Sequence, residues 1–362
     1  MKIGILGAGQ LGRMLALSGY SLNHQFGFSG NATNEPATLL GHMFTKNNNS
    51  DNIDSLVEFA DVITFESENT EVGIVKEINK KIPVYPNEKS LFITQHRGRE
   101  KALFNQLNIP CAPYQMVNSE ADLQAAVETI GLPAILKTAT EGYDGKGQFF
   151  IHETSQITKA WESINGVESI LEGFVNFKRE LSLIAVRGID NSHKYYPLVE
   201  NTHHQGILRL TIAPAQNIDK KVQETAQHYM QTLLDEMNYV GVLTIELFDT
   251  ENGLVVNEMA PRVHNSGHWS IEGANTSQFE NHIRAITGMP LGDTTPTHPF
   301  CAMINIIGQL GDIDAILEMP NAHLHLYDKS ERKNRKLGHI NMTANSQTEL
   351  EDSIAKLKDF LP

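Results

Sequence analysis

The chain has 362 residues, 40% hydrophobic and 20% charged, which is an ordinary composition for a globular protein of two or three domains. Its formal net charge of −14 disfavours a nucleic-acid surface, because phosphate backbones bind basic grooves. No apolar run approaches the length of a membrane span, and the first ten residues lack the long apolar core of a secretory signal. Two distant cysteines, Cys111 and Cys301, suggest no disulfide framework. We therefore expect a cytoplasmic protein that binds neither nucleic acid nor membrane.

Residues 1–95 alternate short apolar segments with stretches of helical spacing. This alternation predicts a parallel sheet with helices on its faces. A boundary is expected at residues 83–86 and the helix near 88–107. The expected strands are 2–6, 24–28, 42–45 and 61–65, and the expected helices are 10–20, 51–60 and 71–80.

A glycine motif, GAGQLG at residues 7–12, follows the first strand and opens the first helix. Glycines in this setting let backbone N–H groups approach a phosphate at a helix N-terminus. A nicotinamide dinucleotide site also needs an acidic residue about 20 positions later, but residues 28–31 read FSGN. The motif therefore indicates either another phosphate-bearing ligand or a purely structural tight turn.

Two glutamates, Glu66 and Glu68, follow the fourth strand at its carboxyl end, where open α/β sheets bind ligands. They could accept hydrogen bonds from ribose hydroxyls or from an amine. The alternative is that this segment caps the next helix, with Asn69 or Thr70 as the N-cap.

Lys137 ends an apolar strand at residues 132–138, and a glycine-rich loop follows at residues 141–147. A lysine on a rigid strand beside such a loop can bind nucleotide phosphates, and the loop can close over them and exclude water. The alternative is an ordinary turn next to a solvated lysine. Strands are expected from 168 to 213, and within them the segment 170–180 could bind an adenine edge through main-chain groups, with Glu180 on the ribose.

A long amphipathic helix is expected at about 218–238, and it leads into a β-hairpin whose turn lies at Asp249–Gly253. Antiparallel pairing places Glu246 and Glu258 opposite or diagonal on one sheet face, about 5–7 Å apart. Two carboxylates so close repel each other unless one is protonated or a cation lies between them. Magnesium prefers one or two carboxylates together with nucleotide phosphates. The hairpin therefore predicts a magnesium site, although two solvated glutamates are the alternative.

The last 65 residues are expected to form a small α/β tail, with strands near 300–307, 322–327 and 337–342. A basic cluster lies between the second and third of these strands. A solvated charge run is the usual explanation for such a cluster, but it could also bind an anionic small substrate. Its members are Lys329, Arg332, Lys333, Arg335 and Lys336.

The order of Lys137, the glycine-rich loop, the connector at 170–180 and the two carboxylates is similar to that of the ATP-grasp superfamily, in which two α+β subdomains clamp ATP. Within it, the chain resembles the 5-(carboxyamino)imidazole ribonucleotide synthetase family over nearly its whole length. One departure is that related chains often carry Asp-Pro after the second strand, where this chain has residues 29–31, SGN. The resemblance is carried by GAGQLGRM (7–14), TFESEN (64–69), GYDGKGQ (142–148), NEMAPRVHNSGHW (257–269) and the tail YDKSERKNRKLGHIN (327–341).

The resemblance implies an α/β and α+β fold of three domains: a Rossmann-like pre-ATP-grasp domain at 1–96, an ATP-grasp domain of two subdomains at 97–290, and a small C-terminal substrate-binding domain at 291–362. The implied ATP-binding residues are Arg97, Lys137, Gly142, Tyr143, Asp144, Gly145, Lys146, Gly147, Gln148, Glu172, Gly173, Phe174, Val175, Glu180, His203, Asn257 and Glu258. His204 adjoins His203, and the sequence does not separate the two.

The implied metal ligands are Glu246 and Glu258, and the implied catalytic residues are Tyr143, Arg262, His264 and Lys329. The ribonucleotide would be held by Gln10, Leu11, Glu66, Asn265, Lys329, Arg335 and Lys336.

The resemblance further implies that the chain carboxylates 5-aminoimidazole ribonucleotide with bicarbonate and ATP, through carboxyphosphate, in purine biosynthesis. Magnesium or manganese would be required, and a homodimer is expected. One alternative is another ATP-grasp ligase, such as a formate-using glycinamide ribonucleotide transformylase. An NAD-binding oxidoreductase is a second alternative, disfavoured by the missing acid. A non-catalytic nucleotide sensor would need neither the carboxylate pair nor the basic tail.

Overall fold

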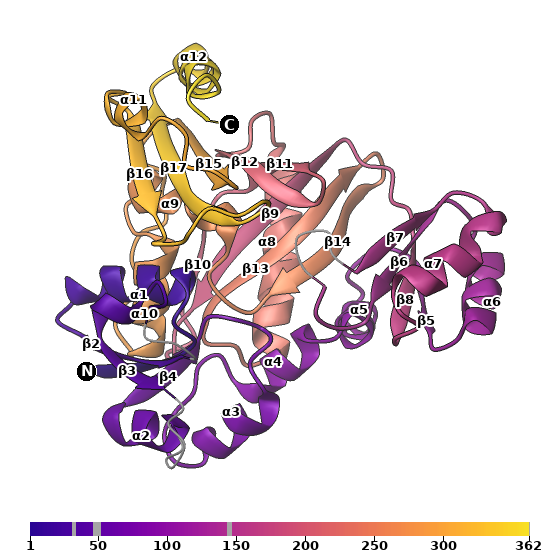
Figure 1. Ribbon diagram of the computed structural model, residues 1–362, viewed down its shortest axis with the longest axis horizontal. Coiled ribbons are helices and arrows are strands. Elements are labelled where there is room, and N and C mark those ends of the chain that lie inside the picture. The colour runs from indigo at the N-terminus through magenta and orange to yellow at the C-terminus, as the bar shows by residue number, and fades with distance from the viewer. Residues whose placement is uncertain (31–33, 46–51, 143–146, 362) are drawn as a thin grey trace.

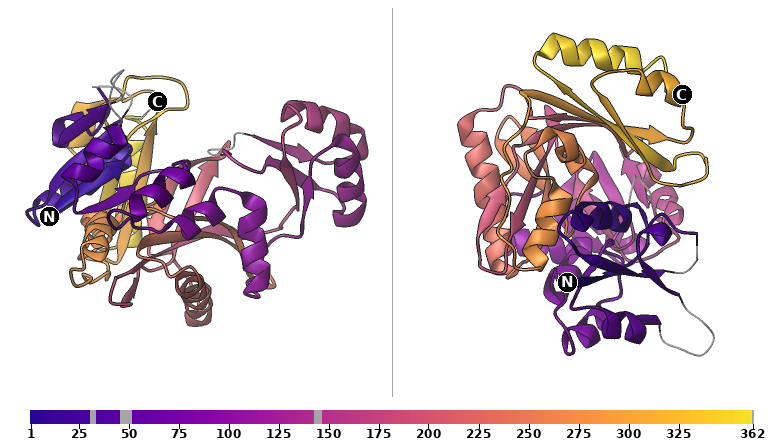
Figure 2. Two further views of the ribbon diagram at one scale, coloured as in Figure 1. Left: turned by 90° about the horizontal axis from the view of Figure 1, so that it is seen from below. Right: turned by 90° about the vertical axis from the view of Figure 1, so that its left-hand side faces the viewer.

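A computed structural model describes residues 1–30, 34–45, 52–142 and 147–361. It contains two four-stranded sheets and one nine-stranded sheet. The N-terminal domain packs through α1 (Gln10–Tyr20) against α10 (Gln278–Ile286), which in turn packs on the nine-stranded sheet, while the lobe built on β5–β8 projects to one side (Figures 1 and 2). Within the described ranges, no helix combines the length and the apolar character needed to cross a bilayer.

The N-terminal sheet is parallel, in the order β3-β2-β1-β4, as the alternating pattern predicts. Its central strand β1 is buried from Ile3 to Leu6, as expected for a strand covered on both faces. The elements are β1 (Lys2–Leu6), α1 (Gln10–Tyr20), β2 (Gln25–Gly30), η1 (Thr38–Leu40), β3 (His42–Thr45), α2 (Asn52–Phe59), β4 (Val62–Phe65) and α3 (Val72–Asn79).

Two local expectations were wrong. Helix α3 begins at Val72 with Glu71 at its N-cap, and no side chain caps it, so neither Asn69 nor Thr70 has that role. The helix expected near 88–107 is divided into α4 (Glu88–Thr94) and α5 (Arg97–Gln106). The division arises because the His96 side chain caps α5 by accepting from the Gly98 N–H, which starts a new helix.

The projecting lobe is an antiparallel sheet in the order β5-β8-β6-β7, with α6 and α7 packed together on it. Its small apolar core is separate from the other cores and includes Leu123, Leu136 and Leu171. The elements are β5 (Tyr114–Val117), α6 (Glu120–Ile130), β6 (Ala134–Thr138), β7 (Gln148–Ile151), η2 (Thr154–Gln156), α7 (Ile157–Ser163) and β8 (Ser169–Gly173).

The nine-stranded sheet has the order β14-β13-β9-β11-β12-β15-β17-β16, with β10 paired to β9. Helix α8 (Lys220–Glu236) packs on it through Ala226, Met230, Leu233 and Leu234, which confirms the expected amphipathic helix. Before the tail, the remaining elements are β9 (Arg179–Arg187), β10 (His193–Tyr195), β11 (Val199–His204), β12 (Ile207–Ala213), β13 (Gly241–Thr250), β14 (Gly253–Ala260), η3 (Asn265–Gly267), α9 (Ser270–Gly273) and α10 (Gln278–Ile286).

The tail strands pair with this same sheet, because β15 lies between β12 and β17. The sheet is therefore continuous across residue 291, and the three domain limits stay a prediction. The tail consists of β15 (Phe300–Ile307), α11 (Ile313–Leu317), β16 (Ala322–Leu326), β17 (Lys336–Ala344) and α12 (Gln347–Leu357).

Candidate active site

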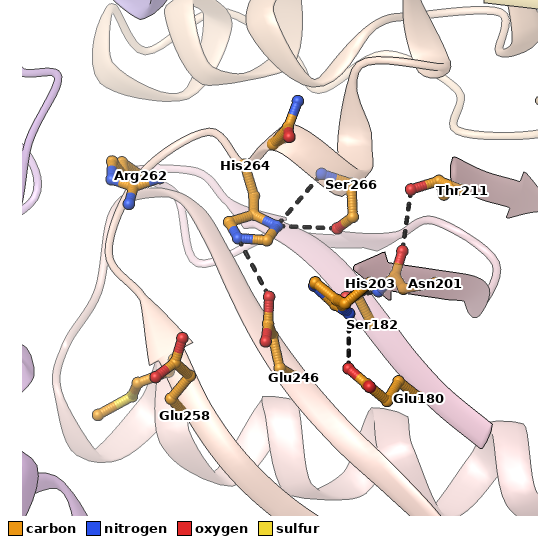
Figure 3. Close-up of polar contacts among 12 residues, drawn as sticks. Glu180, Ser182, Asn201, His203, Thr211, Glu246, Glu258, Arg262, His264 and Ser266 are labelled. Atoms are coloured by element: carbon orange, nitrogen blue, oxygen red, sulfur yellow. Dashed lines mark hydrogen bonds and ion pairs between the residues drawn. The ribbon is translucent and has the colours of Figure 1, made fainter. Parts of the chain in front are cut away.

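The predicted hairpin forms from β13 and β14, and Glu246 is directly opposite Glu258 in its register. Both side chains lie on the same face (Figure 3). Burial, and then the charge of Glu258, raise the pKa of Glu246 to about 7. Burial would also raise the pKa of Glu258, but Arg97, whose Nη1 is 2.7 Å from Glu258 Oε2, lowers it overall. The charged form of Glu258 is thus stabilised by Arg97, whereas the charged form of Glu246 is unfavourable unless a cation lies nearby.

The donor set fits a magnesium ion that also binds nucleotide phosphates. Asn257, next to Glu258, has a buried Oδ1 with no hydrogen-bond partner among the described residues. Within the same residues, no group of three His, Cys, Asp or Glu side chains could hold a metal. Phosphate oxygens would therefore have to complete the coordination of an ion held by Glu246 and Glu258.

A buried charge cluster lies where β6 and β8 approach α5. Lys137 Nζ is 2.9 Å and Lys101 Nζ is 3.4 Å from Glu172 Oε2. Burial would raise the pKa of Glu172, but the two lysines lower it to about 2. The Glu172 side chain therefore extends toward the lysine expected to bind phosphate, and its Oε1 has no hydrogen-bond partner among the described residues.

The glycine-rich loop is described only at its ends, and Tyr143, Asp144, Gly145 and Lys146 lie outside the described residues. Gly142 O accepts from Arg97 Nη2 at 3.2 Å, and Gly147 O accepts from the Thr138 N–H at 2.8 Å. Gly147 has φ +68°, and a Cβ there would lie 2.7 Å from Thr138 Oγ1, so a larger residue would be strained. Gln148 is exposed at the start of β7.

The segment after β8 provides an exposed aromatic side chain. Gly173 ends β8, Phe174 is 46% exposed, and Val175 is half-buried. Phe174 lies beside Phe150, with the ring centroids 6.4 Å apart. An exposed aromatic ring at this position can pack against a planar base.

Glu180 and His203 lie together on β9 and β11 (Figure 3). Their closest atoms, Glu180 Oε2 and His203 Nδ1, are 2.6 Å apart. Burial would lower the pKa of His203, but the Glu180 carboxylate raises it overall. His204 is exposed, so only His203 faces this carboxylate.

Arg262 and His264 follow β14 and line the same cleft as the carboxylate pair. Arg262 forms a two-pronged ion pair with Glu68, with Nη2 2.8 Å from Oε1 and a second contact from Nε to Oε2. His264 accepts from the Ser266 N–H at Nδ1, which leaves its Nε2–H directed at Glu246, 3.4 Å away (Figure 3). Burial and Arg262 lower the pKa of His264 to about 3, so the ring is neutral.

Glu66 occupies the position that the glycine motif would offer to a phosphate. Its two oxygens accept from the Gly9 and Gly12 N–H groups at 2.6 and 2.7 Å. A Cβ at Gly7 would lie 2.4 Å from Glu66 Cγ, which accounts for that glycine. An internal carboxylate thus satisfies the N-terminus of α1, and no dinucleotide is needed to explain the motif.

Part of the basic cluster faces the N-terminal domain and the carboxylates. Lys329 Nζ contacts Gln10 Oε1, and burial lowers the pKa of Lys329 to about 8. Lys336 is close enough to Glu246 for its charge to lower the pKa of that carboxyl. Arg335 holds its own loop by donating to Ser330 O and Oγ at 3.1 and 2.8 Å.

Asn265 forms reciprocal amide hydrogen bonds with Asn305 of β15, at 3.0 and 2.7 Å. Leu11 is half-buried on α1, beside Gln10. No sequence pattern indicated Asn305, because it lies on another strand 40 residues after Asn265.

Many of the predicted site residues line one cleft. They include Arg97, Gly142, Glu246, Glu258, Arg262 and His264. A separate cavity of about 210 Å³, lined mainly by apolar side chains of β15 and α12, contains none of the predicted residues. Sequence reasoning missed several residues that line the cleft. They are Asn69, Thr94, Gln95, Glu100, Ala139, Thr140, Met259 and Ala260.

Three domain families match the chain in order. Residues 1–95 match the ribonucleotide synthetase pre-ATP-grasp domain, residues 102–279 the ATP-grasp domain, and residues 301–353 the phosphoribosylaminoimidazole carboxylase C-terminal domain.

Full-length relatives agree with these matches. The chain is 43% identical to N5-carboxyaminoimidazole ribonucleotide synthase of Pseudomonas aeruginosa, over 100% of this chain and 99% of that protein. The Thermus thermophilus synthetase structure has a TM-score of 0.94 at 42% identity, covering 99% of this chain and 98% of that one. An Aspergillus clavatus synthase in complex with ADP and 5-aminoimidazole ribonucleotide has a TM-score of 0.91 at 31% identity, covering 99% and 98%. With identity above 40% along its whole length and all three domains in order, the chain belongs to the N5-carboxyaminoimidazole ribonucleotide synthase family of ATP-grasp ligases.

Proposed function

We infer that this chain catalyses the ATP-dependent carboxylation of 5-aminoimidazole ribonucleotide with bicarbonate, a step of purine biosynthesis. The observation that carries this inference is the single cleft in which Glu246 and Glu258 meet Arg97, Arg262 and His264. The carboxylates that would bind metal and nucleotide are thereby adjacent to Arg262 and His264, which would bind an anion. A nucleotide sensor would not need these anion-binding residues.

We assign the nucleotide to the space between the small lobe and the large sheet. Lys137 and Arg97 would bind phosphates, and the exposed Phe174 would pack against the adenine beside Val175. Glu180 would bind the ribose, with His203 rather than the exposed His204 as its neighbour. Glu246 and Glu258 would hold Mg²⁺, which when bound neutralises phosphate charge during phosphoryl transfer.

The first chemical step makes bicarbonate electrophilic. A bicarbonate oxygen attacks the γ-phosphorus of ATP, the bond from that phosphorus to the ADP oxygen breaks, and carboxyphosphate, ADP and a proton result. Arg262 would hold the carboxyphosphate charge, and neutral His264 would donate Nε2–H to one of its oxygens. Glu68 keeps Arg262 in place. A cleft closed over this end would exclude water, which would destroy carboxyphosphate.

In the second step the amine of the ribonucleotide attacks the carboxyl carbon. A C–N bond forms, the C–O bond to phosphate breaks, and the amine proton ends on the released phosphate. Lys329, Arg335 and Lys336 would bind the ribonucleotide phosphate. Gln10, Leu11, Glu66 and Asn265 would surround the rest of the ribonucleotide. The residues at 143–146 are assigned to the lid from the sequence alone.

A homodimer and a cytoplasmic location remain expectations from the family resemblance and the composition.

The test is ADP release by the purified chain with each substrate withheld in turn. We expect ADP formation to require both bicarbonate and 5-aminoimidazole ribonucleotide in the presence of Mg²⁺. ADP release that depends instead on glycinamide ribonucleotide and formate would refute the assignment in favour of a transformylase.

A further inference from the structure

The strand that carries Glu258 is the end strand of the large sheet. In the strand order of the described residues, β14 has β13 on one side and no strand on the other. The N–H and C=O groups along such an edge need partners when they are buried. At Val256 the partner is the main chain of the segment before β5, because the Val256 N–H donates to Pro110 O at 2.8 Å.

Beyond Val256, two charged side chains of α5 replace the missing strand. Lys101 Nζ donates to Asn257 O at 2.7 Å, and the Met259 N–H donates to Glu100 Oε1 at 2.6 Å. These two main-chain groups flank Glu258 on either side. The peptide units that set the direction of the Glu258 side chain are therefore both anchored on α5.

Both anchoring side chains are buried, Lys101 at 0% and Glu100 at 3% exposure. Burying charged groups is costly unless each has a specific partner. If these residues only completed the hydrogen bonds of the strand edge, neutral side chains could do so at a lower desolvation cost.

Lys101 also connects the two halves of the cleft. Besides Asn257 O, it lies 3.4 Å from Glu172, which pairs with Lys137 at 2.9 Å. One ammonium group therefore joins the small sheet, which carries Lys137, to the large sheet, which carries Glu258.

We propose that Glu100 and Lys101 are positioning residues of the metal-nucleotide site, which hold Glu258 in place along β14 and at a fixed separation from Lys137. This proposal rests on the proposed function, because it takes Glu258 as a metal ligand and Lys137 as a phosphate ligand. Neither residue touches the reacting atoms.

The experiment measures Mn²⁺ binding by electron paramagnetic resonance in the presence of saturating ADP, with neither bicarbonate nor ribonucleotide present. The variants are Glu100→Gln, Glu100→Leu and Lys101→Met. Glutamine can still accept from the Met259 N–H, whereas leucine cannot. The control is Lys89→Met, because Lys89 Nζ also donates to a main-chain carbonyl, that of Glu236 at 2.7 Å, but on the surface and away from the cleft.

We expect Glu100→Leu and Lys101→Met to raise the Mn²⁺ dissociation constant at least about tenfold, and Glu100→Gln and Lys89→Met to leave it within about twofold of wild type. In steady-state assays the activation constant for Mg²⁺ should rise in the first two variants, while KM for the ribonucleotide stays unchanged. A general loss of folding would instead alter all constants together.

Equal Mn²⁺ affinity in folded Glu100→Leu and Glu100→Gln would overturn the proposal, whether both match wild type or both are weak. If Lys101→Met does not fold, this comparison at Glu100 decides the question alone. Absence of Mn²⁺–ADP binding by the wild-type chain would refute the metal assignment itself, and is thus distinguishable from failure of the positioning role.

Discussion

Replacing Glu246 by Gln should stabilise the metal-free protein while abolishing its activity. The pKa of Glu246 is raised from 4.5 to about 7 by burial and by Glu258. At about 1.4 kcal/mol for each unit of pKa, the ionised side chain costs the folded state at most roughly 3 kcal/mol at pH 8. Because the folded pKa lies above the unfolded one, stability is fully present below pH 4.5 and is lost as the pH rises through 7.

Glutamine removes this cost, since it is neutral at every pH and its amide oxygen can still accept from His264 Nε2–H. We expect the urea midpoint of Glu246→Gln in EDTA to exceed that of wild type at pH 8 and to match it near pH 4.5. The turnover number should fall at least about 100-fold at saturating Mg²⁺ and ATP.

A suitable control is Glu280→Gln, which removes a surface-side ion pair with Arg284 on α10 and should lower stability slightly at pH 8. A Glu246→Gln variant that is no more stable than wild type at pH 8, or that keeps normal turnover, would contradict this prediction.

Further predictions concern the rest of the cleft. Glu258→Gln should lower turnover at least about 100-fold with little loss of folding, and normal ATPase and synthetase rates would refute its role as a metal ligand. Lys137→Met should raise KM for ATP about tenfold or more without changing KM for the ribonucleotide; equal changes in both would contradict a phosphate contact. Glu68→Gln should weaken the hold on Arg262 and lower turnover about 10- to 100-fold, measured as ADP release. For wild type, kcat/KM for the ribonucleotide should decline above about pH 8, where Lys329 loses its proton, whereas Lys329→Arg should extend the plateau; a decline at the same pH in both would exclude Lys329.

The hairpin could be predicted from sequence because all its determinants are local. Strand alternation and a short turn predict Glu246 and Glu258 opposite or diagonal on one face. The structure places them directly opposite, through a shift in register between Glu246 and Leu247 that the sequence did not reveal. The parallel N-terminal sheet and α8 were also predictable, because the apolar residues that define each pattern in the sequence are the ones buried in the structure.

The partners of the acidic residues could not be predicted, because they depend on long-range packing. Glu66 meets Gly9 and Gly12 only because β4 lies beside β1, and Glu68 meets Arg262 across 194 positions of sequence. The break between α4 and α5 was missed because a histidine N-cap is a weak signal next to a continuous helical pattern.

The path of the large sheet has a consequence for how the two substrates meet. Five strand steps separate β13, which carries Glu246, from β17, which begins at Lys336. At about 4.8 Å a step, a flat sheet would hold these positions about 24 Å apart, yet the Lys336 charge reaches the Glu246 carboxyl. A flat sheet does not account for this proximity. Accumulated strand twist, as much as any side chain, would bring the basic residues of the tail over the carboxylate pair.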